Sequence, residues 1–114
     1  MREYSSVGID KRLLNVLNNL YAIEVRLSKI DDGGAVLRNV EKIKDEFEDM
    51  GLFYENPHGQ EFKETRTDLE ATISGEGVDN LYVVEVIKPI VRYGNKEASA
   101  VAQKGIVIVE SKGA

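Results

Sequence analysis

Apolar residues of the segment 13–30 recur at alternating intervals of three and four, and this spacing restricts the segment to an amphipathic helix. The pattern is a heptad seam along one helix face. Asp10 is a suitable N-cap, and the run of aspartate and glycine at 31–34 predicts a break. The seam consists of Leu13, Val16, Leu20, Ile23, Leu27 and Ile30.

A second amphipathic helix is predicted between residues 37 and 50. Its apolar positions also recur at intervals of three and four, and Gly51 stands where a C′ glycine would end the helix. The short break between the two helices predicts an antiparallel hairpin. The apolar positions are Leu37, Val40, Ile43, Phe47 and Met50.

Two amphipathic helices alone cannot enclose their apolar stripes. A second copy of the chain would complete a four-helix bundle, so the sequence predicts a homodimer. Leu14, Leu17 and Tyr21 widen the first stripe, which leaves the alternative that the hairpin packs on the chain's own β half. The expected dimer contacts are Leu13, Val16, Leu20, Ile23, Leu27, Leu37, Val40 and Phe47.

After Gly51 the chain consists of short β-branched segments separated by glycine-containing turns. Strands are predicted at 69–73, 81–87 and 105–110, and the last is apolar on both faces and therefore expected to be central. Pro89 predicts a bend or a sheet edge. The predicted fold class is α+β, with a helical dimerisation module over residues 1–51. A small all-β partner-binding domain, a compact sheet or small barrel, is expected over residues 52–114.

Composition and charge exclude several classes of function. The chain has no cysteine and one histidine, which excludes disulfide frameworks and thiolate zinc sites and fits a reducing, cytoplasmic location. No apolar run approaches the roughly 18 residues of a membrane span. The net charge of -5 argues against nucleic acid. Residues 51–80 hold 2 basic and 7 acidic side chains, whereas residues 81–114 hold 5 and 3.

Catalytic signals are weak. His58 lies in a turn beside Pro57, with no partner in its sequence context. The carboxylates of the segment 61–70 resemble a solvated face and lack the pocket that separates paired pKa values. The glycines at 75 and 77 lack the lysine and following helix of a phosphate loop. The sequence therefore predicts no enzyme, no cofactor and no metal site.

Six short motifs occur in an order that resembles a known family. Residues 13–20 resemble "LLPVLDNL", residues 50–52 "KFGV", residues 57–62 "GEPF", residues 70–73 "HEAV", residues 83–87 "VVEVL" and residues 103–109 "RPAMVVV". Together they resemble the GrpE family, the nucleotide exchange factors of DnaK-type chaperones, over residues 10–110. The chain begins near where the family's long N-terminal helix would end, so a short form is expected.

The resemblance implies a homodimeric cochaperone in protein folding and the stress response. Its β-domain would bind the chaperone's nucleotide-binding domain in an open state and promote ADP release. The alternative is a GrpE-like dimeric adaptor without exchange activity. The implied partner-binding residues are Lys88, Pro89, Ile90, Arg92, Lys96, Gln103, Lys104, Val107 and Val109. For some of these residues a role without a partner remains an alternative. Val107 and Val109 would then be core residues, and the basic side chains would be solvated charges on strands.

Overall fold

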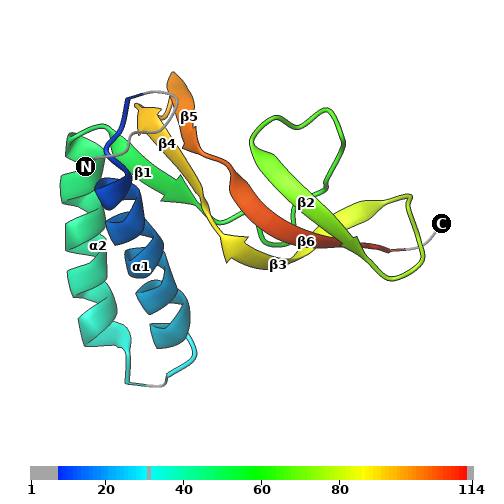
Figure 1. Cartoon of the computed structure of the whole chain (residues 1–114). Helices are drawn as coiled ribbons and strands as arrows, with labels where there is room; N and C mark the ends of the chain where they lie inside the picture. The colour runs from blue at the N-terminus through cyan, green and yellow to red at the C-terminus, as the bar shows by residue number, and fades with distance from the viewer. Residues whose placement is uncertain (1–7, 31, 113–114) are drawn as a thin grey trace.

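The computed structural model describes residues 8–30 and 32–112, and it has the predicted α+β order of a helical hairpin followed by strands (Figure 1). Helix α1 spans Lys11–Leu27 and helix α2 spans Gly34–Asp49. The six strands form two separate three-stranded sheets. A single sheet or a small barrel was expected, and this finer prediction is wrong.

The ends of the helices follow from local capping. Asp10 is the N-cap of α1, as predicted: its Oδ1 atom accepts a hydrogen bond of 2.9 Å from the backbone N–H of Arg12. Gly51 follows α2 with a φ of +87°, and its N–H donates to the carbonyl of Glu48. A left-handed conformation at this position favours glycine, because a side chain there is strained.

The first sheet lies beside the helices and has the order β1-β4-β5. Strand β1 spans Leu52–Glu55, β4 spans Ile90–Gly94 and β5 spans Ser99–Gln103. All of its pairs are antiparallel. These three strands were not predicted. They are short, and the turn residues 94–98 dominate the local pattern between β4 and β5.

The second sheet lies at the far end of the molecule, and we call it the terminal sheet (Figure 1). Its order is β2-β6-β3, with β2 at Leu69–Ser74, β3 at Leu81–Lys88 and β6 at Gly105–Ser111. Strand β6 is central, as its two apolar faces predict. It pairs parallel to β2 and antiparallel to β3.

Three backbone connections pass from one sheet to the other: the long segment 56–68 between β1 and β2, and two short ones. Strand β3 continues into β4 through Pro89, and β5 continues into β6 through Lys104. Pro89 has no N–H, so it interrupts the ladder there. The side-chain amide of Gln103 donates to the Pro89 carbonyl across 3.0 Å and joins the two short connections.

Each sheet has its own hydrophobic core. Leu14 and Leu17 of α1 pack with Leu52, Val91 and Ala102 of the first sheet, so this core extends across residues 51 and 52. The second core lies under the terminal sheet. The radius of gyration is 15.4 Å, larger than the roughly 13 Å of a compact domain of this length. The open shape reflects the two separate cores.

The hairpin uses one apolar face against the first sheet and leaves the other uncovered. Leu14, Leu17 and Tyr21 are buried on the sheet side. Val16 and Ile23 of α1 are 48% and 45% exposed. Packing on the chain's own β half therefore satisfies only part of the apolar stripe.

No helix in the described part of the chain is long and apolar enough to cross a membrane.

Candidate partner-binding surfaces

The nine implied partner-binding residues do not form one surface. Four of them, Pro89, Ile90, Val107 and Val109, are fully buried. Ile90, Val107 and Val109 belong to the core of the terminal sheet. These side chains hold the sheet together and are not available to a partner, which agrees with the core alternative for Val107 and Val109.

Arg92 lies on β4 and is part of an internal ion-pair network. Its Nε atom lies 2.6 Å from Oε1 of Glu55 on β1, and its Nη2 atom lies 2.9 Å from Oδ2 of Asp68. Arg66 pairs with the same Asp68 carboxylate at 3.0 Å. The hydrogen bond from Arg66 lowers the pKa of Asp68 more than partial burial raises it. Arg92 therefore joins the first sheet to the start of β2.

Gln103 also makes internal contacts. Its amide exchanges two hydrogen bonds with the side chain of Asn18 on α1, at 2.8 and 3.0 Å. With its bond to Pro89, Gln103 fixes α1 against the connection between the sheets. This is a structural role that the sequence pattern did not indicate.

Three implied residues remain exposed, and all are lysines. Lys88 and Lys104 lie beside the two short connections between the sheets. Lys96 lies in the turn after β4, 3.7 Å from Glu48 of α2 and 6.0 Å from the centre of the Phe53 ring. Only Lys88 and Lys104 therefore adjoin the terminal sheet.

Two bulges in β3 create an exposed apolar patch that was not predicted. The register shifts at Val84 and again at Ile87, while Glu85 pairs with Ile108 and Lys88 with Ile106. Because alternation continues from buried Val83, Val84 lies on the same outer face as Glu85. By the same reasoning, Ile87 lies on that face with Lys88.

We call this the bulge patch. It is the outer face of the terminal sheet at Val84, Ile87, Ile106 and Ile108. Val84 is 40% exposed and Ile87 is 57% exposed, while the two isoleucines of β6 are half-buried. Glu70, Glu85 and Lys88 border it. The only signal in the sequence is that residues 83–87 do not alternate strictly between apolar and polar.

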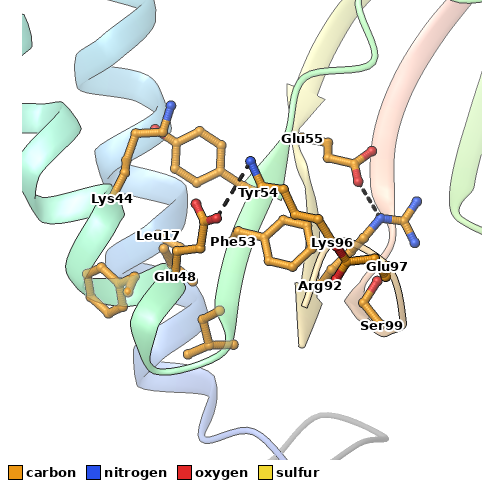
Figure 2. A pocket seen from close by; sticks show the side chains of 12 residues that line it. Leu17, Lys44, Glu48, Phe53, Tyr54, Glu55, Arg92, Lys96, Glu97 and Ser99 are labelled. Atoms are coloured by element: carbon orange, nitrogen blue, oxygen red, sulfur yellow. Dashed lines mark hydrogen bonds and ion pairs between the residues drawn. The ribbon is translucent and has the colours of Figure 1, made fainter. Parts of the chain in front are cut away.

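A cleft of about 640 Å³ opens between α2 and the first sheet (Figure 2). Its charges are mostly paired across short distances: Lys96 faces Glu48, and Arg92 faces Glu55. Phe53 and Tyr54 form its apolar floor. Of these two pairs, Lys96 with Glu48 spans the sheet and the hairpin at an exposed position, whereas Arg92 with Glu55 lies within the first sheet.

Beside this cleft, side chains of α2 and β1 contact the carboxylate of Glu24 on α1. Tyr54 and Lys44 both donate to it, at 2.8 and 3.0 Å. Partial burial raises the pKa of Glu24, but these two hydrogen bonds, together with the charge of Lys44 and a smaller contribution from Glu41, outweigh it and the pKa is lowered. Burial and the hydrogen bond to Glu24 both raise the pKa of Tyr54. The phenol therefore stays protonated and donates.

The hairpin carries a second exposed apolar surface, which we call the hairpin outer face. Val36 and Ile43 of α2 and Met50, its C-cap, recur at the same spacing as Val16, Ile23 and Ile30, and all six are exposed. In an antiparallel pair these positions lie on the same side, opposite β1. Of the eight expected dimer contacts, Leu20 and Val40 are buried within the single chain, and Leu27, Leu37 and Phe47 are half-buried. Leu13, Val16 and Ile23 remain exposed.

Within residues 8–30 and 32–112, no three histidine, cysteine, aspartate or glutamate side chains are grouped so that they could hold a metal ion. His58 is exposed, and its backbone N–H donates to the side chain of Asn56 in the turn. The fold and its two apolar surfaces define a small α+β protein with two uncovered faces. Comparisons with family models, curated proteins and solved structures give no match.

Proposed function

We propose that this protein is a GrpE-like homodimeric cochaperone. It binds the nucleotide-binding domain of a DnaK-type chaperone in an open state and promotes ADP release. The observation that carries the proposal is the bulge patch, an exposed apolar surface with a charged border on the half of the terminal sheet that adjoins the connections to the first sheet. Isolated exposed apolar residues are ordinary, whereas a contiguous group marks an interaction site.

The bulge patch suits this role better than the residues implied by the motifs. Ile87 is exposed and adjoins Lys88, which the resemblance also implies as a contact. An apolar centre with a charged border is the usual arrangement of a protein-binding surface. We therefore propose that Val84 and Ile87 contact the chaperone directly and that Lys88 lies at the border of the contact.

The hairpin outer face supports the dimer. Val16, Ile23 and Ile43 of one chain would pack against the same residues of a second copy, as self-complementary contacts about a two-fold axis require. The four helices then form a bundle with the first sheet of each chain on the outside. This arrangement leaves both bulge patches uncovered, one on each chain.

No bond chemistry is needed for the proposed activity. A factor that binds the open chaperone better than the closed one shifts the population toward the open state. ADP and the exchange protein must then weaken each other's binding to the chaperone by the same ratio. Each tenfold weakening of ADP needs about 1.4 kcal/mol of differential affinity. A few well-buried apolar side chains supply energies of this size.

Release of a fluorescent ADP analogue from a DnaK-type chaperone tests the proposal. We expect saturating wild-type protein to accelerate release and Ile87→Glu to abolish the acceleration. Val78→Glu is the matched control, because Val78 is exposed in the loop before β3 and lies outside the patch. An unchanged release rate with the wild type would reject the proposal.

A second candidate function is a GrpE-like dimeric adaptor without exchange activity. It is favoured by the burial of Pro89, Ile90, Val107 and Val109, which removes four implied contacts. Calorimetry with the chaperone's nucleotide-binding domain separates the candidates. Binding without faster ADP release assigns the adaptor. Binding that is lost on Lys88→Glu, together with faster release by the wild type, assigns the exchange factor.

A further inference from the structure

The two edges of the terminal sheet differ in how they are protected. The edge at β3 is covered over its first half, because Gly59 and Phe62 donate backbone hydrogen bonds to the carbonyls of Val83 and Leu81. Its second half contains the two bulges, which disrupt the regular row of backbone groups. Bulges and covering segments are common ways to keep an edge strand from pairing with another chain.

The edge at β2 has neither device. Strand β2 pairs with β6 through six consecutive positions without a register shift. It contains no proline, lysine or arginine. Among the residues that the structure describes, no backbone hydrogen bond reaches the side of β2 that faces away from β6.

The ladder shows which backbone groups are unpaired. The carbonyl of Asp68 accepts a bond of 3.0 Å from the N–H of Gly105, so Asp68 points toward β6. Backbone groups alternate in direction along a strand, so those of Glu70 and Thr72 also point toward β6. The N–H and C=O groups of Ala71 and Ile73 therefore point outward, along an open edge.

An apolar side chain accompanies this open edge. Ile73 pairs with Val109, which is fully buried, yet Ile73 itself is 43% exposed. A strand added beside β2 would place a side chain next to Ile73 and cover it, as cross-strand neighbours do. The edge therefore offers both unpaired backbone groups and an apolar contact.

The charge around the edge selects the chemistry of the added strand. Residues 67–87 contain five acidic side chains and no basic one. Asp68 is already paired with Arg66 and Arg92. Glu70 on β2, Glu76 in the loop that follows it and Glu110, which pairs with Ser74, are exposed and make the surroundings of β2 negative, and such a field favours a positively charged partner.

We propose that the outer edge of β2 is a peptide-binding site for an extended segment of another protein with alternating apolar and basic residues. The segment adds as a fourth strand, so that its backbone pairs with Ala71 and Ile73 and its basic side chains lie near Glu70. The site is separate from the bulge patch and does not depend on the proposed exchange activity.

Amide hydrogen exchange on the full chain tests the site residue by residue. The probe is a peptide of about eight residues, alternating lysine and valine and blocked at both ends, a length typical of a strand. Without the peptide, the amides of Glu70 and Thr72 should be protected and those of Ala71 and Ile73 should exchange rapidly. With the peptide, exchange at Ala71 and Ile73 should slow by at least about tenfold.

Two controls separate strand addition from attraction of charge. The same peptide N-methylated at its central residues keeps its charge but cannot pair along either edge, so it should leave the exchange of Ala71 unchanged. Ile73→Pro removes an outward N–H and should weaken binding of the unmodified peptide by about tenfold or more. Ile73→Lys introduces a lysine, which commonly protects edge strands from pairing, and its side chain stays in solvent. It should also weaken binding of the unmodified peptide by about tenfold or more.

Val78→Lys is the matched control for Ile73→Lys, because it adds the same charge at an exposed position off the edge. It should keep most of the binding. Equal losses in both lysine variants, or equal binding of the methylated peptide, would show attraction of charge only and overturn the proposal. Protection of Ala71 and Ile73 that appears without peptide and falls on dilution would assign the edge to a second copy and also overturn it.

Discussion

Tyr54 on β1 donates a hydrogen bond from its hydroxyl to Oε1 of Glu24 on α1, across 2.8 Å. The ring of Tyr21 stands edge-on to that of Tyr54, with centroids 5.7 Å apart. Lys44 of α2 reaches the second oxygen of the same carboxylate at 3.0 Å. Glu24 is thus the point at which both helices and the first sheet are joined.

Tyr54→Phe removes this hydroxyl and keeps the ring contact. Glu24 then loses one donor in a partly buried position, and we expect the free energy of unfolding to fall by about 1–2 kcal/mol. Urea denaturation of both proteins measures the difference. The control is Tyr93→Phe, at an exposed tyrosine of β4. Equal midpoints for Tyr54→Phe and the wild type would contradict the role given to this bond.

Acid should destabilise the protein through Glu24 and Asp68. Burial raises the pKa of Glu24 in the folded chain, but the hydrogen bonds from Tyr54 and Lys44 and the charge of Lys44 together lower it by more. The pKa of Asp68 is lowered chiefly by the hydrogen bond from Arg66. A carboxyl with a lowered folded pKa contributes stability above its unfolded pKa and loses it as the pH falls through the folded value. We therefore expect the contribution of these two carboxyls to the free energy of unfolding to be constant above about pH 5 and to decline below about pH 4.

The variants Glu24→Gln and Asp68→Asn check this pH dependence. Each should be less stable than the wild type at pH 7, and the gap should narrow toward pH 3. Glu64→Gln, at an exposed position before β2, is the control and should follow the wild-type curve. Parallel curves for all four proteins would show that these two carboxyls do not carry the acid sensitivity.

Arg92 should be sensitive even to a conservative change. Its guanidinium bonds Glu55 and Asp68 from different nitrogens, a fork that the single ammonium of lysine does not reproduce. We expect Arg92→Lys to cost about 1–3 kcal/mol. A double-mutant cycle with Asp68→Ala measures the coupling. A coupling energy of zero would mean that the contact between the two sheets adds nothing to stability.

The proposed dimer makes a prediction for the hairpin outer face. Ile23→Glu combined with Ile43→Glu places charge where two copies would meet, at positions that are each 45% exposed in the single chain. We expect a monomeric mass in sedimentation equilibrium and an unchanged helical circular dichroism signal, because neither side chain is buried within the chain. A wild type that is itself monomeric would reject the dimer.

Leu20 is less suitable for this test. It belongs to the heptad seam, but it is only 6% exposed within a single chain. Glutamate at this position would bury a charge and unfold the hairpin. Loss of the dimer and loss of the fold would then be indistinguishable. For the double variant Ile23→Glu/Ile43→Glu, the control is Val78→Glu, which adds a charge at an exposed position outside the hairpin.

The sequence predicted the hairpin because periodicity and capping act locally. Asp10, Gly51 and the heptad spacing each report on a few neighbouring residues, and the caps and the first helix appear as expected, except that α1 ends at Leu27 and leaves Ile30 of the seam outside the helix. The same is true of β6, whose apolar faces indicate a central strand. Which part of the wide apolar stripe faces the sheet depends on long-range packing, and spacing alone did not decide it.

The candidate surfaces were harder to predict. The bulge patch arises from two register shifts in β3, and register depends on the partner strand β6. The internal roles of Arg92 and Gln103 depend on Glu55 and Asn18, which are distant in the sequence. Charged and amide residues on strands resemble surface positions until their partners are known, so the sequence alone did not show that these two side chains make internal contacts.

The two short connections at Pro89 and Lys104 also have a mechanical consequence. A force applied at the terminal sheet reaches the hairpin through three covalent segments, and the Gln103 amide ties the two short ones together at Pro89. These segments therefore limit how far the two sheets can turn relative to each other. In the proposed dimer, the stiffness of these segments would determine how closely the orientation of each terminal sheet follows that of the bundle.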